Sequence, residues 1–382
     1  MRLQHWQTAE VRDRIDGVFH YFRRSMTRRR RRDDDRMKRS FRMTIRTFIK
    51  TVVIAVSGFL LANLFAYGEG PVGKTLVVRH SSTDDTATIQ VGGLEKTLVV
   101  LHITDAHVSV ADEREAQYHQ YGSRMDNAYG REREHWRTKT KALPVAHFHD
   151  LLASAKDRNV DLIALTGDIV NNPSQSSVQF ISKALNETGV RWLYISGNHD
   201  WHYEGMAGSD DALRKTWTQK RLIPLYPGRN PLCYAVRLGG INFVAIDNST
   251  YQVTEGQLAF YEKEIARGLP TVLLLHIPIY TPASAGKYAS DSCGDPSWGW
   301  DTDRSHEIER RERWSKSGNL PSTTAFVDRV GKTGNLIAVL AGHTHKARTV
   351  KLSDSAVQYI GQATCNGGSR LITFAPCTGD KN

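Results

Sequence analysis

Short apolar segments recur between residues 98 and 340, and most of them end in polar residues of one kind. They are LVVLHI (98–103) before TDAH, VDLIAL (160–165) before TGD, VRWLYI (190–195) before SGNHD, TVLLL (271–275) before His276, and LIAVL (336–340) before AGHTH. Nearly continuous apolar runs of this length are typical of strands buried on both faces of a sheet. We therefore expect buried strands at these five places.

Amphipathic segments around residues 143–158, 176–187 and 254–267 predict helices between these strands. The third begins with Thr254 as N-cap and Gln257 three residues later, the spacing of a capping box. Alternating strands and helices predict parallel βαβ units. In the middle of the chain CYAVRL and INFVAI flank Gly239-Gly240, a hairpin signal, and the tail from 347 to 374 also has strand character. The pattern predicts an α/β fold of two packed sheets covered by helices.

Active sites of such sheets lie at the carboxyl ends of the strands, where this chain places carboxylate, amide and imidazole groups. These are Asp105, His107, Asp168, Asn198, His199, Asp200, His276, His343 and His345. A single histidine after a strand is more often a structural residue than a ligand, and Asp after Gly is ordinary turn chemistry. Five strand ends with such groups together, however, indicate a cluster that is held by cations.

The donor types narrow the choice of metal. Oxygen and imidazole donors without thiolate suit Mn, Fe or Zn, and more than six donors indicate two ions. Two such ions can share a bridging hydroxide and clamp a phosphoryl group for in-line displacement. The residues alone therefore point to a dinuclear metal centre that is able to act on a phosphoryl group.

The order of these motifs resembles that of the calcineurin-like metallophosphoesterases. The matching residues are Asp105-x-His107, Gly167-Asp168, Gly197-Asn198-His199-Asp200, His276 and Gly342-His343-x-His345, within residues 96–374. The resemblance implies a four-layer αββα sandwich of two mixed sheets with a dinuclear centre at the strand ends. It implies a first metal on Asp105, His107, Asp168 and His345, and a second on Asp168, Asn198, His276 and His343.

In the same resemblance Asp168 bridges the two metals, and His199 and Asp200 are catalytic residues that bind no metal. His199 contacts the scissile phosphate and protonates the leaving oxygen, while Asp200 holds its ring. One departure is informative: purple acid phosphatases carry Tyr three residues after the bridging Asp, and this chain has Asn171. A divalent pair such as Mn or Zn is therefore expected instead of a Tyr–Fe(III) site.

Two long inserts are the candidates for substrate specificity. The first, residues 109–140, contains Tyr118, Tyr121, Arg131, Arg133 and Trp136; the second, residues 281–322, contains Trp298, Trp300, Arg310, Arg311 and Arg313. In the functional interpretation these side chains stack on a substrate ring or bind extra phosphate. In the competing structural interpretation the second insert is a self-packed surface loop with a Cys293 disulfide. The substrate class stays open between lipid-linked and nucleotide phosphoesters, and the alternative function is a catalytically silent scaffold.

The N-terminal region is unlike the rest of the chain. Formal net charge is +11, and +10 of it lies in residues 23–50, where thirteen Arg and Lys oppose three Asp. Residues 51–67 then lack any charge, and with Phe48 and Ile49 they are long enough to span a bilayer. Basic residues on one flank predict a single-pass type II signal anchor with the catalytic domain lumenal or extracellular. A cleaved signal peptide, a mitochondrial presequence and a buried core helix are the competing interpretations.

These features predict a domain organisation: a basic cytosolic segment (1–47), a transmembrane anchor (48–67), a linker or edge strand (68–95) and the metallophosphoesterase domain (96–382). Four cysteines, Cys233, Cys293, Cys365 and Cys377, all follow the anchor and permit two disulfides on an oxidising side of the membrane. Two sequons, at Asn186 and Asn248, are compatible with the same side. No nucleic-acid partner is expected, because topology explains the basic run.

A possible nucleotide loop, GEGPVGKT, occupies residues 68–75 and fits the P-loop pattern. That pattern requires a strand before it and a helix after it. Here the anchor precedes it, and TLVVRH, which has strand character, comes directly after its lysine. We therefore expect no ATP at residues 68–75, and a P-loop NTPase is disfavoured.

Overall fold

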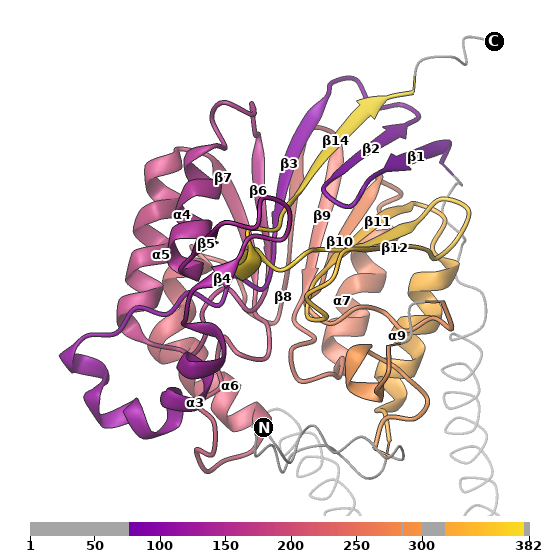
Figure 1. Ribbon diagram of the computed structural model, residues 1–382. Helices are drawn as coiled ribbons and strands as arrows, with labels where there is room; N and C mark the ends of the chain where they lie inside the picture. Colours follow the sequence, from indigo (N-terminus) through magenta and orange to yellow (C-terminus); the bar gives the residue numbers. More distant parts are fainter. Residues whose placement is uncertain (1–75, 284–285, 300–317, 378–382) are drawn as a thin grey trace, which may run out of the picture. The chain divides into compact units, whose positions relative to one another are not determined.

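Two six-stranded mixed sheets face each other in the computed structural model, which describes residues 76–283, 286–299 and 318–377 (Figure 1). The first sheet has the order β1 (Val78–Ser82), β2 (Thr86–Val91), β14 (Arg370–Pro376), β3 (Leu98–Ile103), β6 (Leu162–Thr166) and β7 (Arg191–Ile195). The second has the order β12 (Arg348–Lys351), β13 (Val357–Ile360), β11 (Leu336–Ala341), β10 (Thr271–Leu274), β9 (Ile241–Ile246) and β8 (Cys233–Leu238). In each sheet the neighbours that carry the site motifs run parallel.

Helices cover the outer faces of the two sheets (Figure 1). On the first sheet lie α4 (Pro144–Ala153) and α5 (Gln175–Thr188), and on the second lie α7 (Glu255–Ile265) and α9 (Pro321–Lys332). The layers therefore run helix, sheet, sheet, helix, as predicted. The smaller elements are η1 (Glu113–Tyr118), α3 (His119–Tyr129), β4 (Arg133–Glu134), β5 (Lys141–Ala142), α6 (Asp210–Trp217), η2 (Thr218–Leu222), η3 (Ile223–Leu225), η4 (Ala289–Asp291) and η5 (Thr364–Asn366).

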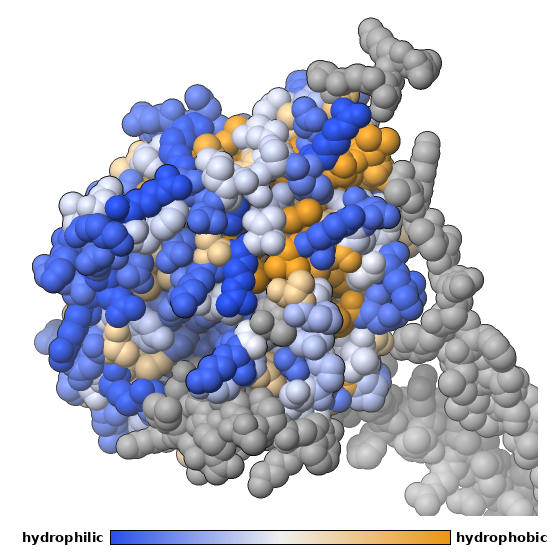
Figure 2. All heavy atoms as spheres, turned by 45° about the vertical axis from the view of Figure 1, so that its right-hand side comes forward, coloured by the Kyte–Doolittle hydropathy of each residue, from blue (hydrophilic) through white to orange (hydrophobic). Residues whose placement is uncertain are grey.

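Strand β9 shows why the apolar runs are continuous. Phe243 and Ala245 point into the core between the sheets, where Phe243 meets Phe374 of β14 edge to face at 6.1 Å. Val244 and Ile246 belong instead to the core under α7 and α9. Successive side chains of a strand point to opposite faces, so a strand buried on both sides needs apolar residues at every position. Figure 2 shows that the outer face, in contrast, is mostly hydrophilic.

Local signals are confirmed where they were strongest. The capping box is present: Thr254 Oγ1 accepts from Gln257 N, and Gln257 Oε1 accepts from Thr254 N. Strands β8 and β9 form the predicted antiparallel hairpin. Its two glycines, Gly239 and Gly240, have φ of 57° and 82°, the left-handed values that a tight two-residue turn requires.

Residues 68–95 were predicted to be a linker or an edge strand, and from Val78 onward the structure has strands there. Strand β1 pairs antiparallel with β2, and β2 pairs parallel with β14, so both belong to the first sheet. The element after the P-loop-like sequence is therefore a strand and not a helix. No helix among the described residues is long and apolar enough to cross a membrane, and the expected anchor at 48–67 lies outside them.

The permitted disulfides are not formed. All four cysteines are free thiols, with Cys293 and Cys365 buried in the core. The interpretation of the second insert as a loop with a Cys293 disulfide is therefore wrong in that detail. The sequon at Asn248 is also buried, and its side chain is used inside the protein, so it is closed to glycosylation in the folded state.

Candidate metal centre

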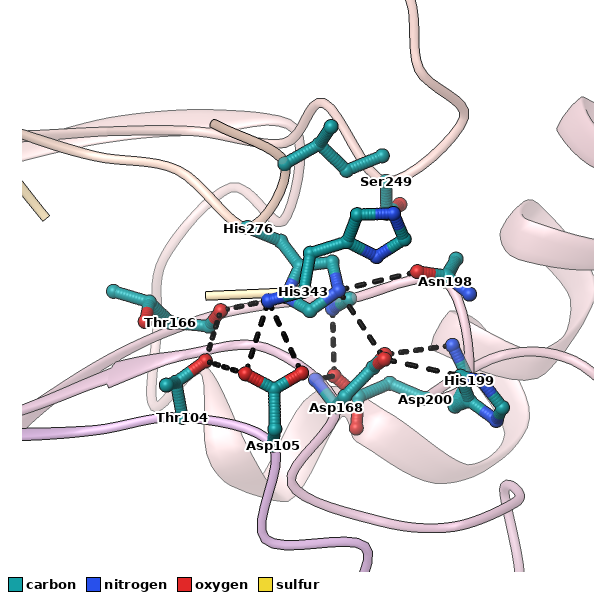
Figure 3. A network of polar contacts seen from close by, with 12 residues as sticks. Thr104, Asp105, Thr166, Asp168, Asn198, His199, Asp200, Ser249, His276 and His343 are labelled. Atoms are coloured by element: carbon teal, nitrogen blue, oxygen red, sulfur yellow. Dashed lines mark hydrogen bonds and ion pairs between the residues drawn. The ribbon is translucent and has the colours of Figure 1, made fainter. Parts of the chain in front are cut away.

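The predicted donors converge from five strand ends onto one cluster (Figure 3). Asp105, His107 and His345 form one group, in which one ligand atom from each residue lies within 4.8 Å of the others. A second group with the same spacing contains Asp168, His276 and His343. These groups match the two predicted ligand sets except for Asp168 in the first and Asn198 in the second.

Asp168 and Asn198 occupy the places that the ligand sets require. His276 Nε2 lies 3.2 Å from Asp168 Oδ2 and 3.1 Å from Asn198 Oδ1. Asp168 also belongs to a third close group, with His107 and His199. It therefore lies within reach of donors from both sets, as a bridging carboxylate must.

The donor geometry fits divalent cations. His107 Nε2 and His345 Nε2 lie 3.1 Å apart, and His345 Nε2 is 3.4 Å from Asp105 Oδ1. All three residues place their lone pairs toward the same space, and the side chains of Asp105 and His107 are buried. A cation bound between two imidazoles and a carboxylate satisfies all of these groups, which a single proton cannot do.

Hydrogen bonds outside the cluster set the imidazole tautomers. His276 Nδ1 donates to the backbone oxygen of Thr166 at 2.8 Å, and His343 Nε2 donates to that of Ser290 at 2.8 Å. Because a carbonyl can only accept, the proton of each neutral ring is held there. Nε2 of His276 and Nδ1 of His343 therefore remain as donors to a metal, the arrangement usual for ligating histidines.

The backbone at the site is strained. Eight non-glycine residues of the described chain have positive φ, and five of them are predicted donors. These are Asp105, His107, Asp168, His343 and His345, with φ between 45° and 69°. Residues other than glycine rarely adopt this left-handed backbone conformation, because it costs about 1 kcal/mol or more for each residue. Such a concentration indicates that the turns are shaped for the site.

Two glycines let the backbone approach the carboxylates closely. A Cβ added at Gly342 would overlap Thr104 Oγ1 and lie 2.6 Å from Asp105 Oδ2. A Cβ added at Gly167, whose φ is 88°, would lie 2.6 Å from His276 Nδ1. Because the backbone at Gly342 comes this close, the backbone N–H of His343 can donate to Asp105 Oδ2 at 2.9 Å. At both positions a side chain would therefore clash with neighbouring atoms, and at Gly167 the positive φ also favours glycine.

The pKa values of the carboxylates and imidazoles in the cluster are shifted by the charges of their neighbours. Burial alone would raise the pKa of Asp105, but the His345 and His276 imidazoles hold that pKa at about 2. The pKa of Asp168 lies well below its usual range, because neighbouring His276 and His199 outweigh its burial. Burial likewise opposes the charge of His276, yet Asp168 raises the pKa of His276 to about 9. Both carboxylates are thus charged and ready for cations.

Two further donor histidines are held neutral. Desolvation lowers the pKa of His107 to about 4 and that of His343 to about 3. A neutral imidazole is the form that ligates metal. Of His107, His276 and His343, only His276 carries a second proton, and hence a positive charge, near pH 7, because the charge on Asp168 holds it there.

The structure assigns Asp200 different contacts from those expected. Its carboxylate accepts backbone N–H groups from Gly197 at 2.7 Å, Val170 at 2.8 Å and Asp168 at 2.9 Å. Burial, and then repulsion from Asp168, raise the pKa of Asp200 to about 7. Asp200 thus ties the turn after β6 to the turn after β7, and its role in holding the His199 ring stays a prediction.

His199 faces the cavity above the donors. Its backbone N–H donates to Asp168 Oδ1 at 2.8 Å, and its Nε2 lies 4.0 Å from Asp168 Oδ2. The cavity has a volume of about 400 Å³, and its lining includes Tyr129, Asn198, His199 and Tyr251 beside the donors. The ring of His199 is therefore next to the space in which a bound phosphoryl group would lie.

Three residues contact the site whose roles could not be predicted from the sequence. Asn248 Oδ1 accepts from the backbone of His276 at 3.1 Å and so holds the end of β10. Tyr129 of α3 stacks on His107, with ring centres 4.1 Å apart and planes 9° apart. Asp126, one turn earlier, accepts from Ser109 Oγ at 2.7 Å and fastens α3 over the site. The first insert was singled out as functional, but nothing in its local sequence distinguishes Tyr129 from its other aromatic residues.

Two of the side chains named from the inserts pack against other aromatic residues of the protein. Tyr118 stacks on Tyr203 with ring centres 5.1 Å apart, and Trp298 is buried against Tyr251 at 4.8 Å. The remaining candidates of the first insert, Tyr121, Arg131, Arg133 and Trp136, are also absent from the lining of the cavity. Those of the second insert, Trp300, Arg310, Arg311 and Arg313, lie outside the described residues. Trp298 thus agrees with the self-packed interpretation.

Asn171 has a structural contact that accounts for its place. Its Nδ2 donates to Asp126 Oδ1 at 2.9 Å, and the residue is buried. The position that carries Tyr in purple acid phosphatases therefore supports α3 in this chain.

Comparison with known proteins identifies the class. The profile of the calcineurin-like phosphoesterase family matches residues 98–347, which is well over half of the chain. The chain therefore belongs to the calcineurin-like phosphoesterase family, whose domain is that of a phosphoric ester hydrolase.

Individual relatives are more distant. A probable cyclic nucleotide phosphodiesterase from Fibrobacter succinogenes is 25% identical over 209 residues, spanning 54% of this chain and 66% of that protein. Among solved structures, a dimetal phosphatase from Danio rerio has a TM-score of 0.44 at 11% identity, covering 70% of this chain and 88% of that one. A purple acid phosphatase from yellow lupin (Lupinus luteus) has a TM-score of 0.43 at 13% identity, and the match covers 77% of this chain and 49% of that one. At these scores neither structure bears on the substrate.

Proposed function

We propose that this protein hydrolyses phosphoester bonds with two divalent cations, Mn or Zn, held by the seven predicted donors. One observation carries the proposal: donors from five strand ends meet in two groups, and Asp168 reaches both. When bound, such cations supply Lewis-acid stabilisation of phosphoryl charge and a nucleophile at neutral pH. A catalytically silent scaffold is disfavoured, because all seven donors are present and converge.

The side chains of the protein divide the remaining work. Asp105 and Asp168 carry the charge that holds the cations, and His107, His276, His343 and His345 complete their coordination. Asn198 adds a neutral oxygen beside His276. His199 donates a proton to the leaving oxygen, since its ring lines the cavity without a place in the ligand sets. Asp200 keeps the two donor turns together.

For the substrate class we propose a phosphodiester. The support is the similarity to a probable cyclic nucleotide phosphodiesterase. The open, polar cavity offers room for groups on both sides of a phosphate, with a volume of about 400 Å³. A monoesterase of the same site would differ only in what surrounds the scissile phosphate.

The test is direct. The purified protein is stripped of metal, reloaded with Mn or Zn, and assayed with p-nitrophenyl phosphate and bis(p-nitrophenyl) phosphate. We expect turnover that depends on added metal, a stoichiometry near two ions per chain, and the higher kcat/KM on the bis ester. The absence of turnover of either ester by a metal-loaded protein would exclude the enzyme and leave the scaffold.

Replacing Asp168 by Asn tests the bridging role. Asn has one neutral oxygen where the carboxylate offers two that share a negative charge, so one cation loses its ligand and both lose the charge that attracts them. We expect kcat/KM to fall by about a thousandfold or more, because several kcal/mol of charge stabilisation are lost. Elemental analysis should find less than one ion per chain. Asp328→Asn, at an exposed position of α9, serves as the control and should retain both activity and metal.

We further propose that residues 48–67 anchor the chain in a membrane as a type II signal anchor. The support is the uncharged stretch with +10 of charge on its N-terminal flank. The full chain should stay with membranes through alkaline carbonate extraction, and protease added to sealed vesicles should spare the catalytic domain. Release of the full chain by carbonate would refute the anchor.

A further inference from the structure

The rim of the cavity above the donors is rich in cationic side chains. Lys346 and Arg348 follow His345 directly on the way into β12, and Lys287 comes from the insert after β10. Lys346 and Lys287 are exposed and Arg348 is half-buried. One carboxylate outside the donor sets, that of Asp291, lines the same cavity. It accepts from the backbone of Tyr288 at 3.4 Å, within its own turn.

These cationic side chains lie outside the donor sets. Two divalent cations on the carboxylates of Asp105 and Asp168 already supply the positive charge that holds the scissile phosphate. Lys346, Arg348 and Lys287 place further positive charge on the rim of the cavity, beside that phosphate. Charge-assisted hydrogen bonds from Lys and Arg are the usual means of binding phosphate.

The space continues beyond the rim. A second cavity, of about 510 Å³, lies against residues 347–350, Ala283 and the turn of residues 82–84 between β1 and β2. Arg348 lines both cavities. Arg348 therefore lies where the cavity above the metal donors and the second space adjoin, and the second space can take the remainder of an elongated molecule.

We propose that Lys346, Arg348 and Lys287, which line the same cavity, form a second anion subsite, and that the substrate carries a second phosphate group beside the scissile one. This inference rests on the proposed function for the first phosphate site. It narrows the substrates to small molecules with two phosphate groups.

The probes are glucose 6-phosphate and glucose 1,6-bisphosphate, which differ by one phosphate group. Dissociation constants are measured by calorimetry on the full-length, metal-loaded His199→Ala variant, in which turnover is slow. We expect the bisphosphate to bind about tenfold more tightly, as one added charge-assisted contact gives. Arg348→Gln and Lys346→Gln should each remove most of that advantage and leave the affinity for the monophosphate within about twofold. Arg348→Lys should retain part of it.

Lys351→Gln is the matched control, because Lys351 lies on the same strand, is exposed and pairs with Asp354 at 2.9 Å. It should change neither dissociation constant. Equal affinity for the two probes in the parent protein, or equal weakening of both in the rim variants, would overturn the subsite. Turnover of bis(p-nitrophenyl) phosphate by the wild-type enzyme reports on the proposed function separately, since it needs no second phosphate.

Discussion

Three consecutive residues at the end of β7 illustrate how the site divides its tasks among single side chains. Asn198 turns its oxygen to His276, His199 turns its ring to the cavity, and Asp200 turns back to bind the backbone. Consecutive side chains of a tight turn point in different directions, so one short motif reaches three environments. Each residue can therefore be tested by a change that leaves the other two in place.

His199→Ala should lower the rate and leave the metal in place. A general acid typically contributes about a hundredfold to ten-thousandfold, and it matters most when the leaving oxygen is basic. We therefore expect a large fall in kcat for a dialkyl phosphodiester, whose leaving group is a basic alkoxide, and a small one for bis(p-nitrophenyl) phosphate, whose leaving group is p-nitrophenolate. Elemental analysis should still find two ions. An equal loss for both leaving groups, or a loss of metal, would contradict the assignment.

Metal affinity should rise with pH because of His276. Its pKa is raised to about 9, so below that pH a cation must displace a proton from the ring. His107 and His343, with pKa values of about 4 and about 3, are already neutral and add no such dependence. We expect the apparent Kd for Zn to fall by up to about tenfold for each pH unit between 6 and 8. Competition with a chromophoric chelator measures this.

The matched variant for that titration is His276→Gln. It should bind more weakly at every pH but lose most of the slope, since the titrating ring is gone. A wild-type affinity that stays flat between pH 6 and 8 would show that His276 is not protonated in the metal-free protein.

Elements buried on both faces could be predicted from the sequence, because burial leaves a local pattern. Strand β3 has the predicted bounds, and β11 and α7 differ from prediction by two residues or fewer at each end. Helix α3 could not be predicted in this way. Only Gly122 and Met125 of it are buried. The helix is held by hydrogen bonds that Asp126 accepts from Asn171 and Ser109, which no local periodicity reveals.

The same distinction applies to the site. The donors could be predicted because each comes after a recognisable strand. The contacts of Asp200 could not, because its neighbour in sequence, His199, differs from its neighbours in space. The edge strand β1 and its neighbour β2 could not be predicted for a related reason, since their place depends on the pairing of β2 with β14, which lies at the other end of the domain in sequence.

Gly342→Ala should disrupt the turn after β11. The new Cβ would overlap the side chain of Thr104 and approach that of Asp105, and both of these side chains are buried and hydrogen-bonded to each other at 2.8 Å, so neither can move away freely. We expect a loss of several kcal/mol in the free energy of unfolding, as for other overpacked core positions, together with weakened metal binding. Urea denaturation and elemental analysis measure the two effects.

Gly331→Ala is the control for that substitution. Gly331 lies within α9, and a Cβ there meets nothing within 4 Å. Alanine is favoured over glycine inside a helix by about 0.5–1 kcal/mol, so this variant should be slightly more stable and fully active. Equal behaviour of the two alanine variants would show that Gly342 is not needed for close approach.

On the scale of the whole molecule, the catalytic domain depends on strands that lie immediately after the proposed anchor. Residues 71–382 cluster as one compact unit. Within it β2 pairs along the full length of β14, and Ile89 and Val91 are completely buried. Buried Arg370 donates to the backbone oxygens of Thr83 and Thr86, so the turn between β1 and β2 also supplies acceptors for a buried charge.

Truncation at two points tests this dependence. A chain that begins at Pro71 retains both strands and should fold cooperatively, with the wild-type kcat/KM on bis(p-nitrophenyl) phosphate. A chain that begins at Lys96 loses about 1.5–3 kcal/mol for each of Ile89 and Val91 and leaves Arg370 buried without its acceptors. These losses approach the whole stability of a domain, about 5–15 kcal/mol. We therefore expect the shorter chain to aggregate in size-exclusion chromatography, and a shorter chain with an unchanged Tm would refute the account of β1 and β2 as parts of the enzyme.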